Sequence, residues 1–140
     1  MSAKLMEYFN TTQAKLGTLS TANNAGKVNV AHFGTPHMID ENTIVMGMGQ
    51  NRTFANLQDN PNAVFMIMEP GEAPPEWHGA RIYLTMTACE TSGETLDSIR
   101  SAVAEAAGEE TAKMIHAAVI FKIDEIRPVA DFGQGWEHLI

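Results

Sequence analysis

One stretch of the chain combines residue types that together can hold an anion. The segment Val45 to Pro61, VMGMGQNRTFANLQDNP, runs from an apolar strand through a glycine-containing turn into a short helix that ends at a proline. Asn51 is expected to cap this helix, so Arg52 and Thr53 occupy its first turn, where backbone N–H groups have no partner within the helix. A fixed cation and a hydroxyl beside free N–H groups make a site suited to a phosphate.

Two glycines precede this helix start. Gly47 and Gly49 lack side chains, so a flat group attached to the phosphate can lie close against the backbone there. The alternative is an ordinary strand-turn-helix unit in which Arg52 is a solvated surface charge. The segment alone does not decide between the two.

Composition limits the classes of partner. The chain has 140 residues, which predicts a single domain over residues 1–140 with a real core. The formal net charge is -8 and the pI is about 5.0, which argues against broad binding to nucleic acid or to anionic membranes. An anionic ligand must therefore be held by local groups rather than by the field of the whole protein.

Other signals for catalysis, metal binding or export are missing from the sequence. The five histidines never approach one another at metal-ligand spacing, so no metal site is expected. The single cysteine, Cys89, lies on a strand without a neighbouring cation and is expected to be an inert packed thiol, while Asp124 and Glu125 read as a solvated rim. With no long apolar run and no signal peptide, we expect a soluble cytoplasmic protein.

The residue patterns around the anion-site segment predict a mostly β protein with short helices. Short helices are expected around Leu5 and Phe9, after a capping-box spacing of Thr91 and Glu94, and from about Glu109 to His116. No strand-helix-strand alternation runs through the chain, so an antiparallel barrel with helices at its edges is favoured. The six expected strands are Leu16–Thr21, Val28–Thr35, Thr43–Met48, Ala63–Met68, Arg81–Cys89 and Ala118–Val129.

Two irregular segments carry exposed aromatic residues. The proline-rich stretch EPGEAPPEWHGA is a surface loop that ends with Trp77 and His78, and a tryptophan in such a loop usually has something to cover. The tail ADFGQGWEHLI is too apolar for a free terminus. We expect it to lie against another subunit or over a site.

The order of the motifs VNVAHFG, IVMGMGQNRT and FANLQDNPNAVFMIM resembles the FMN-binding split-barrel family, the superfamily of pyridoxamine 5'-phosphate oxidase. The resemblance extends from about Leu16 to Val129. It implies an antiparallel, six-stranded split β-barrel with peripheral helices, and a homodimer that holds FMN at the subunit interface.

The resemblance also implies which residues contact the cofactor. The flavin phosphate would be held by Arg52 and Thr53, with Gln50 and Asn51 beside them. The isoalloxazine would lie against two strands, and its contacts there would be Val30, Ala31, His32, Phe33, Gly47, Met48 and Gly49. The candidates for contacts from the second chain are Trp77, Arg81 and Trp136.

The expected function is an FMN-dependent oxidoreductase that passes electrons between a reduced donor and a small acceptor. Oxidation of vitamin B6 is disfavoured, because no arginine follows Arg127 and the tail reads GWEHLI. His32 is a candidate proton donor to the reduced flavin or a satisfied core histidine. Heme-degrading and deazaflavin-using relatives, a non-enzymatic flavin carrier or store, and a barrel that binds another phosphate ligand remain as alternatives.

Overall fold

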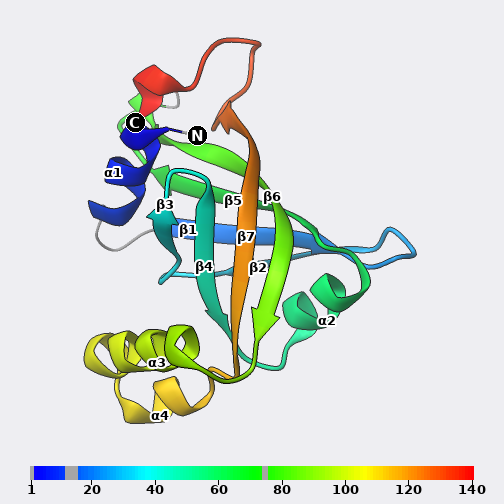
Figure 1. Ribbon diagram of the computed structural model, residues 1–140. Helices are drawn as coiled ribbons and strands as arrows, with labels where there is room; N and C mark the ends of the chain where they lie inside the picture. The colour runs from blue at the N-terminus through cyan, green and yellow to red at the C-terminus, as the bar shows by residue number, and fades with distance from the viewer. Residues whose placement is uncertain (1, 12–15, 74–75) are drawn as a thin grey trace.

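Seven antiparallel strands form one sheet that curls on itself without closing (Figure 1). The computed structural model describes residues 2–11, 16–73 and 76–140. In the sheet the strands follow the order β2-β1-β5-β6-β7-β4-β3, so β2 and β3 are its two edges. The strands are β1 (Leu16–Ala22), β2 (Val28–His32), β3 (His37–Asp40), β4 (Thr43–Met48), β5 (Asn62–Glu69), β6 (His78–Glu90) and β7 (Ala117–Pro128).

The helices lie at the two ends of the curled sheet. Figure 1 shows α1 and the 3-10 helix η2 near both chain termini, and α2, α3 and α4 at the opposite end. Across the described ranges, no helix has the length and apolar character needed to span a membrane. The helices are α1 (Ala3–Thr11), α2 (Arg52–Asp59), α3 (Glu94–Ala107), α4 (Glu109–Lys113) and η2 (Glu137–Leu139).

Alternating residues of the central strands build the core. Leu19, Phe65, Ile82 and Phe121 point inward from four strands and are fully buried. Phe9 of α1 closes one end of this core, and its ring meets the ring of Phe65 edge-on with 5.6 Å between centroids. Burying a side chain of this size contributes about 1.5–3 kcal/mol, so the inward face of each strand sets the register of the sheet.

The expected count of six strands is wrong, because a seventh, β3, lies at one edge. It spans only His37–Asp40, pairs with β4 alone, and has one inward residue, Met38, in its burial pattern. A four-residue strand between Pro36 and a polar turn shows too little alternation for a sequence pattern to reveal it. The other six strands are confirmed, with boundaries shifted by a few residues.

Two helix starts contrast in how they are capped. Ser2 caps α1, and its Oγ accepts a hydrogen bond from Leu5 N at 3.2 Å. The capping box expected for Thr91 and Glu94 is wrong: α3 begins at Glu94 after Gly93, whose φ of 110° suits glycine and which supplies no side-chain cap. The helix expected to reach His116 ends earlier, at Lys113.

Buried polar contacts tie α2 to the first hairpin. Asn56 Nδ2 donates to Thr21 Oγ1 of β1 at 3.1 Å, and both side chains are buried. Asn29 Nδ2 of β2 donates to Thr53 Oγ1 at 3.3 Å. Leu57, on the same side of the helix, packs into the core. These contacts hold the start of α2 beside the edge strand β2.

We predict that Asn56→Ala lowers the free energy of unfolding by about 1–3 kcal/mol, because the Thr21 hydroxyl stays buried without its donor. The measurement is urea unfolding followed by circular dichroism. Gln50→Ala removes an exposed amide outside the helix and serves as the control, with an expected change within about 0.5 kcal/mol. Equal effects of the two substitutions would contradict a specific role for the Asn56 contact.

Candidate functional site

The start of α2 carries two backbone donors that the chain leaves free. Asn51 caps the helix as expected: its backbone is extended and its Oδ1 accepts from Phe54 N at 2.9 Å. The Asn51 carbonyl accepts from Ala55 N at 3.0 Å. Within the described residues, neither the N–H of Arg52 nor that of Thr53 has an acceptor. Both groups are therefore available to an anion.

The side chains of Arg52 and Thr53 have different surroundings. Arg52 is exposed, and no described residue forms an ion pair or hydrogen bond with its guanidinium. Thr53 is 1% exposed and its hydroxyl accepts from Asn29. On the single chain, the free cation at this helix start is therefore Arg52, while the Thr53 hydroxyl already serves to attach the helix to β2.

The space beside Gly47 is occupied by side chains, whereas the sequence interpretation of the two glycines before α2 assumed open space. A Cβ on Gly47 would lie 2.6 Å from Ile99 Cγ2 and 2.9 Å from Ile115 Cγ2, so these side chains fill the space that a flat group was expected to use. Next to it, Met48 is fully buried in the core. At Gly49 the nearest atom to an added Cβ is the Met114 carbonyl oxygen, at 3.0 Å. The lack of a side chain at Gly47 therefore makes room for Ile99 of α3 and for Ile115.

The edge strand β2 lies beside the start of α2, where Asn29 bonds to Thr53. Val30 is 62% exposed, His32 is exposed, and Ala31 lies half-buried between them. β2 pairs only with β1, so the backbone groups on its free side have no strand partner. The N–H of Phe33 is occupied, because it donates to the Gly17 carbonyl at 3.0 Å.

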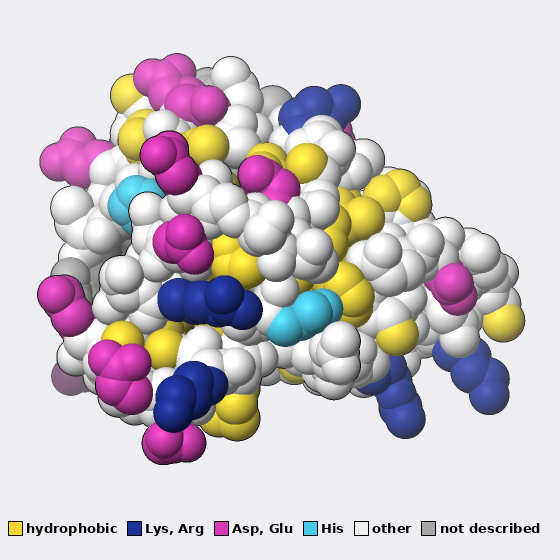
Figure 2. All heavy atoms as spheres, turned by 60° about the horizontal axis from the view of Figure 1, so that its bottom comes forward, with side chains coloured by type: hydrophobic (Ala, Val, Ile, Leu, Met, Phe, Trp, Pro, Cys, Tyr) yellow, Lys and Arg dark blue, Asp and Glu magenta, His cyan; other side chains and the backbone are white. Residues whose placement is uncertain are grey.

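Phe54, Met114 and His116 lie near the start of α2 and were not predicted as site residues from the sequence. The ring of His116 meets the ring of Phe54 edge-on, with 4.6 Å between centroids, and its Nδ1 lies 3.3 Å from the Met48 carbonyl oxygen. Met114 is 65% exposed beside them. Figure 2 shows apolar side chains exposed over the middle of this end of the molecule. A lone histidine before a strand gives no sequence signal that it will pack against a helix 60 residues earlier.

Arg81 binds within its own chain, at another part of the sheet. Its guanidinium donates to the Pro128 carbonyl at 2.9 Å, to the Tyr83 hydroxyl at 3.1 Å and to Asp131 Oδ2 at 2.6 Å. Arg127 Nε donates to the same Asp131 oxygen at 2.7 Å. The bond from Arg127 and the bond from the Gly133 N–H lower the pKa of Asp131 to about 2. This cluster attaches the start of the tail to the barrel.

The tail itself packs on its own chain. Trp136 and Ile140 lie against the core cluster, and the Glu137 carbonyl accepts from Lys4 Nζ of α1. Trp77 lines a groove of about 340 Å³ together with Phe132 and Leu139 of the tail. Phe132 remains 90% exposed. Trp77, Arg81 and Trp136 therefore lie away from α2 of the same chain, and only a second chain could bring them to it.

The remaining ionisable residues offer no second chemical centre. The described residues contain no group of three or more His, Cys, Asp or Glu side chains placed to hold a metal ion. Burial raises the pKa of the Cys89 thiol, which disfavours the reactive thiolate. Asp124 and Glu125 are exposed on β7, as expected for a solvated rim.

Comparison with solved structures assigns the fold. The chain is similar to an FMN-binding protein from Syntrophomonas wolfei subsp. wolfei, with a TM-score of 0.76 and 26% identity over 93% of this chain and 85% of that one. It is also similar to a candidate pyridoxamine 5'-phosphate oxidase from Lactobacillus delbrueckii, with a TM-score of 0.63 and 14% identity over 91% of this chain and 93% of that one.

A third similar structure has a different ligand in its description. The heme storage protein HutZ from Vibrio cholerae matches with a TM-score of 0.65 and 16% identity over 97% of this chain and 98% of that one. The sequence matches no protein-family model and no curated protein sequence. The likenesses establish the split-barrel fold, and they include both flavin-binding and heme-binding proteins.

We predict that Asp131→Asn destabilises the protein at neutral pH and that the difference from the unchanged chain shrinks as the pH falls. The folded-state pKa of Asp131 is about 2, below its ordinary value near 3.9, so its ionised form stabilises the fold. That contribution is complete above pH 4 and is lost as the pH falls toward 2. Urea midpoints at pH 7, 4 and 2 measure it. A constant difference at all three values would show that the charge of Asp131 is not the cause.

Proposed function

Because this chain has the split-barrel fold of the pyridoxamine 5'-phosphate oxidase-like flavoproteins, we propose that it binds FMN and acts as an oxidoreductase. The observation that carries the proposal is the start of α2, where two N–H groups and an exposed guanidinium have no partner among residues 2–11, 16–73 and 76–140. The identity of 26% with an FMN-binding protein supports FMN as the ligand.

The donor set fits a phosphate monoester. The N–H groups of Arg52 and Thr53 lie at the N-terminus of α2, which is the positive end of the helix dipole. The Arg52 side chain adds a full positive charge there. Gln50 is exposed next to them and can donate a further hydrogen bond. In a chain with a net charge of -8, such local donors are what would hold a dianion.

The ring system attached to that phosphate would lie along β2. Asn29 bonds to Thr53, so the free edge of β2 and the start of α2 are adjacent. The unpaired backbone groups of the edge can bond the polar rim of the ring, and Val30 offers an apolar side chain there. Phe54 and His116 would limit the pocket on the side of the turn.

We further propose that a second copy of the chain completes the site on the side that β2, Phe54 and His116 leave open. The outer face of the sheet aligns Val30, Ser20, Val64 and Tyr83 across four neighbouring strands. Val28 is 84% exposed on the same face, and a groove of about 480 Å³ runs between Val28, Val64 and Tyr83. An apolar sheet face at an open edge is the kind of surface that a homodimer buries. Trp77, Arg81 and Trp136 of the partner are the proposed contacts to the flavin.

FMN, when bound, supplies hydride and electron transfer at its N5 atom. The chain's own part is to bind the phosphate, to orient the ring along β2 and to exclude water through the dimer contact. His32, on the exposed face of β2, is the proposed proton donor beside the ring. In this proposal the electrons pass from a reduced donor to a small acceptor.

Three measurements on the purified chain test the proposal. Incubation with FMN and removal of free ligand should leave a yellow protein with one FMN per subunit. A parallel incubation with hemin tests the ligand of the heme storage relative. A protein that retains hemin but not FMN would overturn the flavin assignment. Anaerobic mixing of the FMN-loaded protein with NADH or NADPH should bleach the flavin, and an absence of bleaching would favour an electron carrier or flavin store.

We predict that Arg52→Ala weakens FMN binding by about 1.5–3 kcal/mol, or roughly 10- to 150-fold in Kd, the cost of one charge-assisted hydrogen bond. Isothermal titration with FMN measures the change. Lys122→Ala is the control, because Lys122 is an exposed cation that lies away from the start of α2. It follows Ala117, the β7 partner of Met48, by five residues. Its Kd should change by less than about twofold. Unchanged affinity of Arg52→Ala would show that the phosphate binds elsewhere.

We predict that Val64→Lys raises the dissociation constant of the dimer by at least about tenfold, because it places a charge in the apolar face. Light scattering after size-exclusion chromatography at several protein concentrations measures it. Ser101→Lys introduces the same charge on the exposed side of α3 and should leave the dimer unchanged. A dimer equally stable in both variants would place the interface on another surface.

A further inference from the structure

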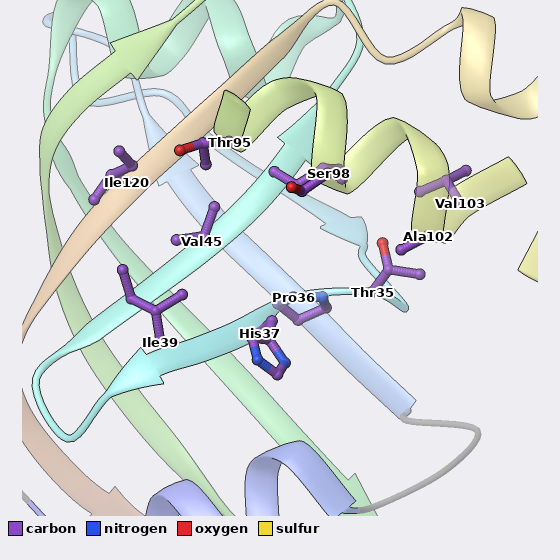
Figure 3. Close-up of a pocket in the computed structure, with 11 residues that line it drawn as sticks. Thr35, Pro36, His37, Ile39, Val45, Thr95, Ser98, Ala102, Val103 and Ile120 are labelled. Carbon is purple, nitrogen blue, oxygen red and sulfur yellow. The ribbon is translucent and has the colours of Figure 1, made fainter. Parts of the chain in front are cut away.

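A third groove lies between α3 and the strands β3, β4 and β7 (Figure 3). Its volume is about 520 Å³. Val45 of β4 and Ile120 of β7 form its floor, and Ile39 of β3 borders it while remaining 56% exposed. The proposed flavin site does not use these residues.

The groove has walls on two further sides. Figure 3 shows Ser98, Ala102 and Val103 on the side of α3 that faces the strands. Thr35 and Pro36, from the connection between β2 and β3, close the opposite side. A floor with two walls from different elements makes a concave site, and its volume falls in the range of about 300–1,000 Å³ typical of small-molecule pockets.

The lining selects for a neutral ligand. None of the residues around the groove is Asp, Glu, Lys or Arg, although the chain as a whole carries a net charge of -8, and His37 is the one ionisable residue in the lining. An ion would lose its hydration here without gaining a permanent opposite charge, whereas a neutral ligand can use the His37 imidazole as a further hydrogen-bonding partner. Aliphatic side chains of the floor and helix dominate the surface, so an apolar molecule would bury area on three sides.

Three hydroxyl groups at the rim add a polar component. Within the described part of the chain, the side chains of Thr35, Thr95 and Ser98 make no hydrogen bond to protein. Each hydroxyl can both donate and accept. A ligand with one hydrogen-bonding group would find a partner at the rim while its apolar body lies on Val45 and Ile120.

We propose that this groove is a separate binding site for an uncharged, largely apolar small molecule that carries a hydrogen-bonding group. This inference goes beyond the flavin site and does not depend on it. Ile99 lines the groove and, with Ile115, packs over Gly47, so these side chains stand between the groove and the turn before α2. A molecule in the groove is therefore not in contact with a ligand at the start of α2.

The test uses N-phenyl-1-naphthylamine, a neutral aromatic amine with one N–H group whose fluorescence rises in apolar surroundings. Titration into the full chain, with and without FMN, should give saturable binding with the same Kd in both cases. Ala102→Phe fills the groove from the helix side and should weaken binding by at least about tenfold. Ala107→Phe is the matched control, an exposed alanine of the same helix outside the groove, and should change the Kd by less than about twofold.

A second variant keeps the shape and removes a hydrogen bond. Thr35→Val should weaken probe binding by about threefold or more, because the amine loses a possible acceptor. The proposal is overturned if binding is not saturable, if Ala102→Phe and Ala107→Phe behave alike, or if FMN displaces the probe. It is also overturned if Ala102→Phe changes the oligomeric state, since the groove would then be a contact between two copies of the chain.

Discussion

The attachment of α2 to the first hairpin is the contact on which the proposed site depends. Two amide-hydroxyl pairs, Asn56 with Thr21 and Asn29 with Thr53, join the helix to β1 and β2 in a largely apolar region. Because a buried polar group is costly without its partner, these pairs allow few alternative positions of the helix. They place the start of α2 beside the edge strand β2, and these two elements form the site proposed for an anionic, ring-bearing ligand.

The open sheet leaves two strand edges that a second copy of the chain could cover in the proposed dimer. A closed barrel would have no edges, whereas here β2 and β3 each leave one side unpaired. The outer face of β2 also carries two exposed valines, Val28 and Val30. Arg81, which was expected to contact the ligand, is held by Asp131 and Pro128 of its own chain. In the proposed dimer, Arg81 would contact the ligand of the partner subunit from its position on β6, with its guanidinium already paired to Asp131.

The contact between Gly47 and α3 divides this region into two parts. Ile99 and Ile115 take the space that a side chain at position 47 would need, and α3 lies close to β4 for that reason. On one side of this contact are Gly49, His116 and the start of α2; on the other is the groove between α3 and β3. One end of the sheet can thus carry both a polar site for an anion and an apolar groove that has no Asp, Glu, Lys or Arg. The packed side chains of Ile99 and Ile115 lie between the two.

Local patterns in the sequence were sufficient for six of the seven strands, for the capping of α2 by Asn51, and for Arg52 as a free cation at the helix start. Such features depend on residues within a few positions of one another, so alternation and capping rules reveal them. Tertiary structure decided the rest: the edge strand β3, the packing of Ile99 on Gly47, and the capture of Arg81 by Asp131 50 residues away. These depend on which distant segments the curled sheet brings together, and no local pattern encodes that distance. For the same reason, the phosphate site at this helix start stays a prediction from the sequence, while only the fold showed that Thr53 is turned toward Asn29 and away from solvent.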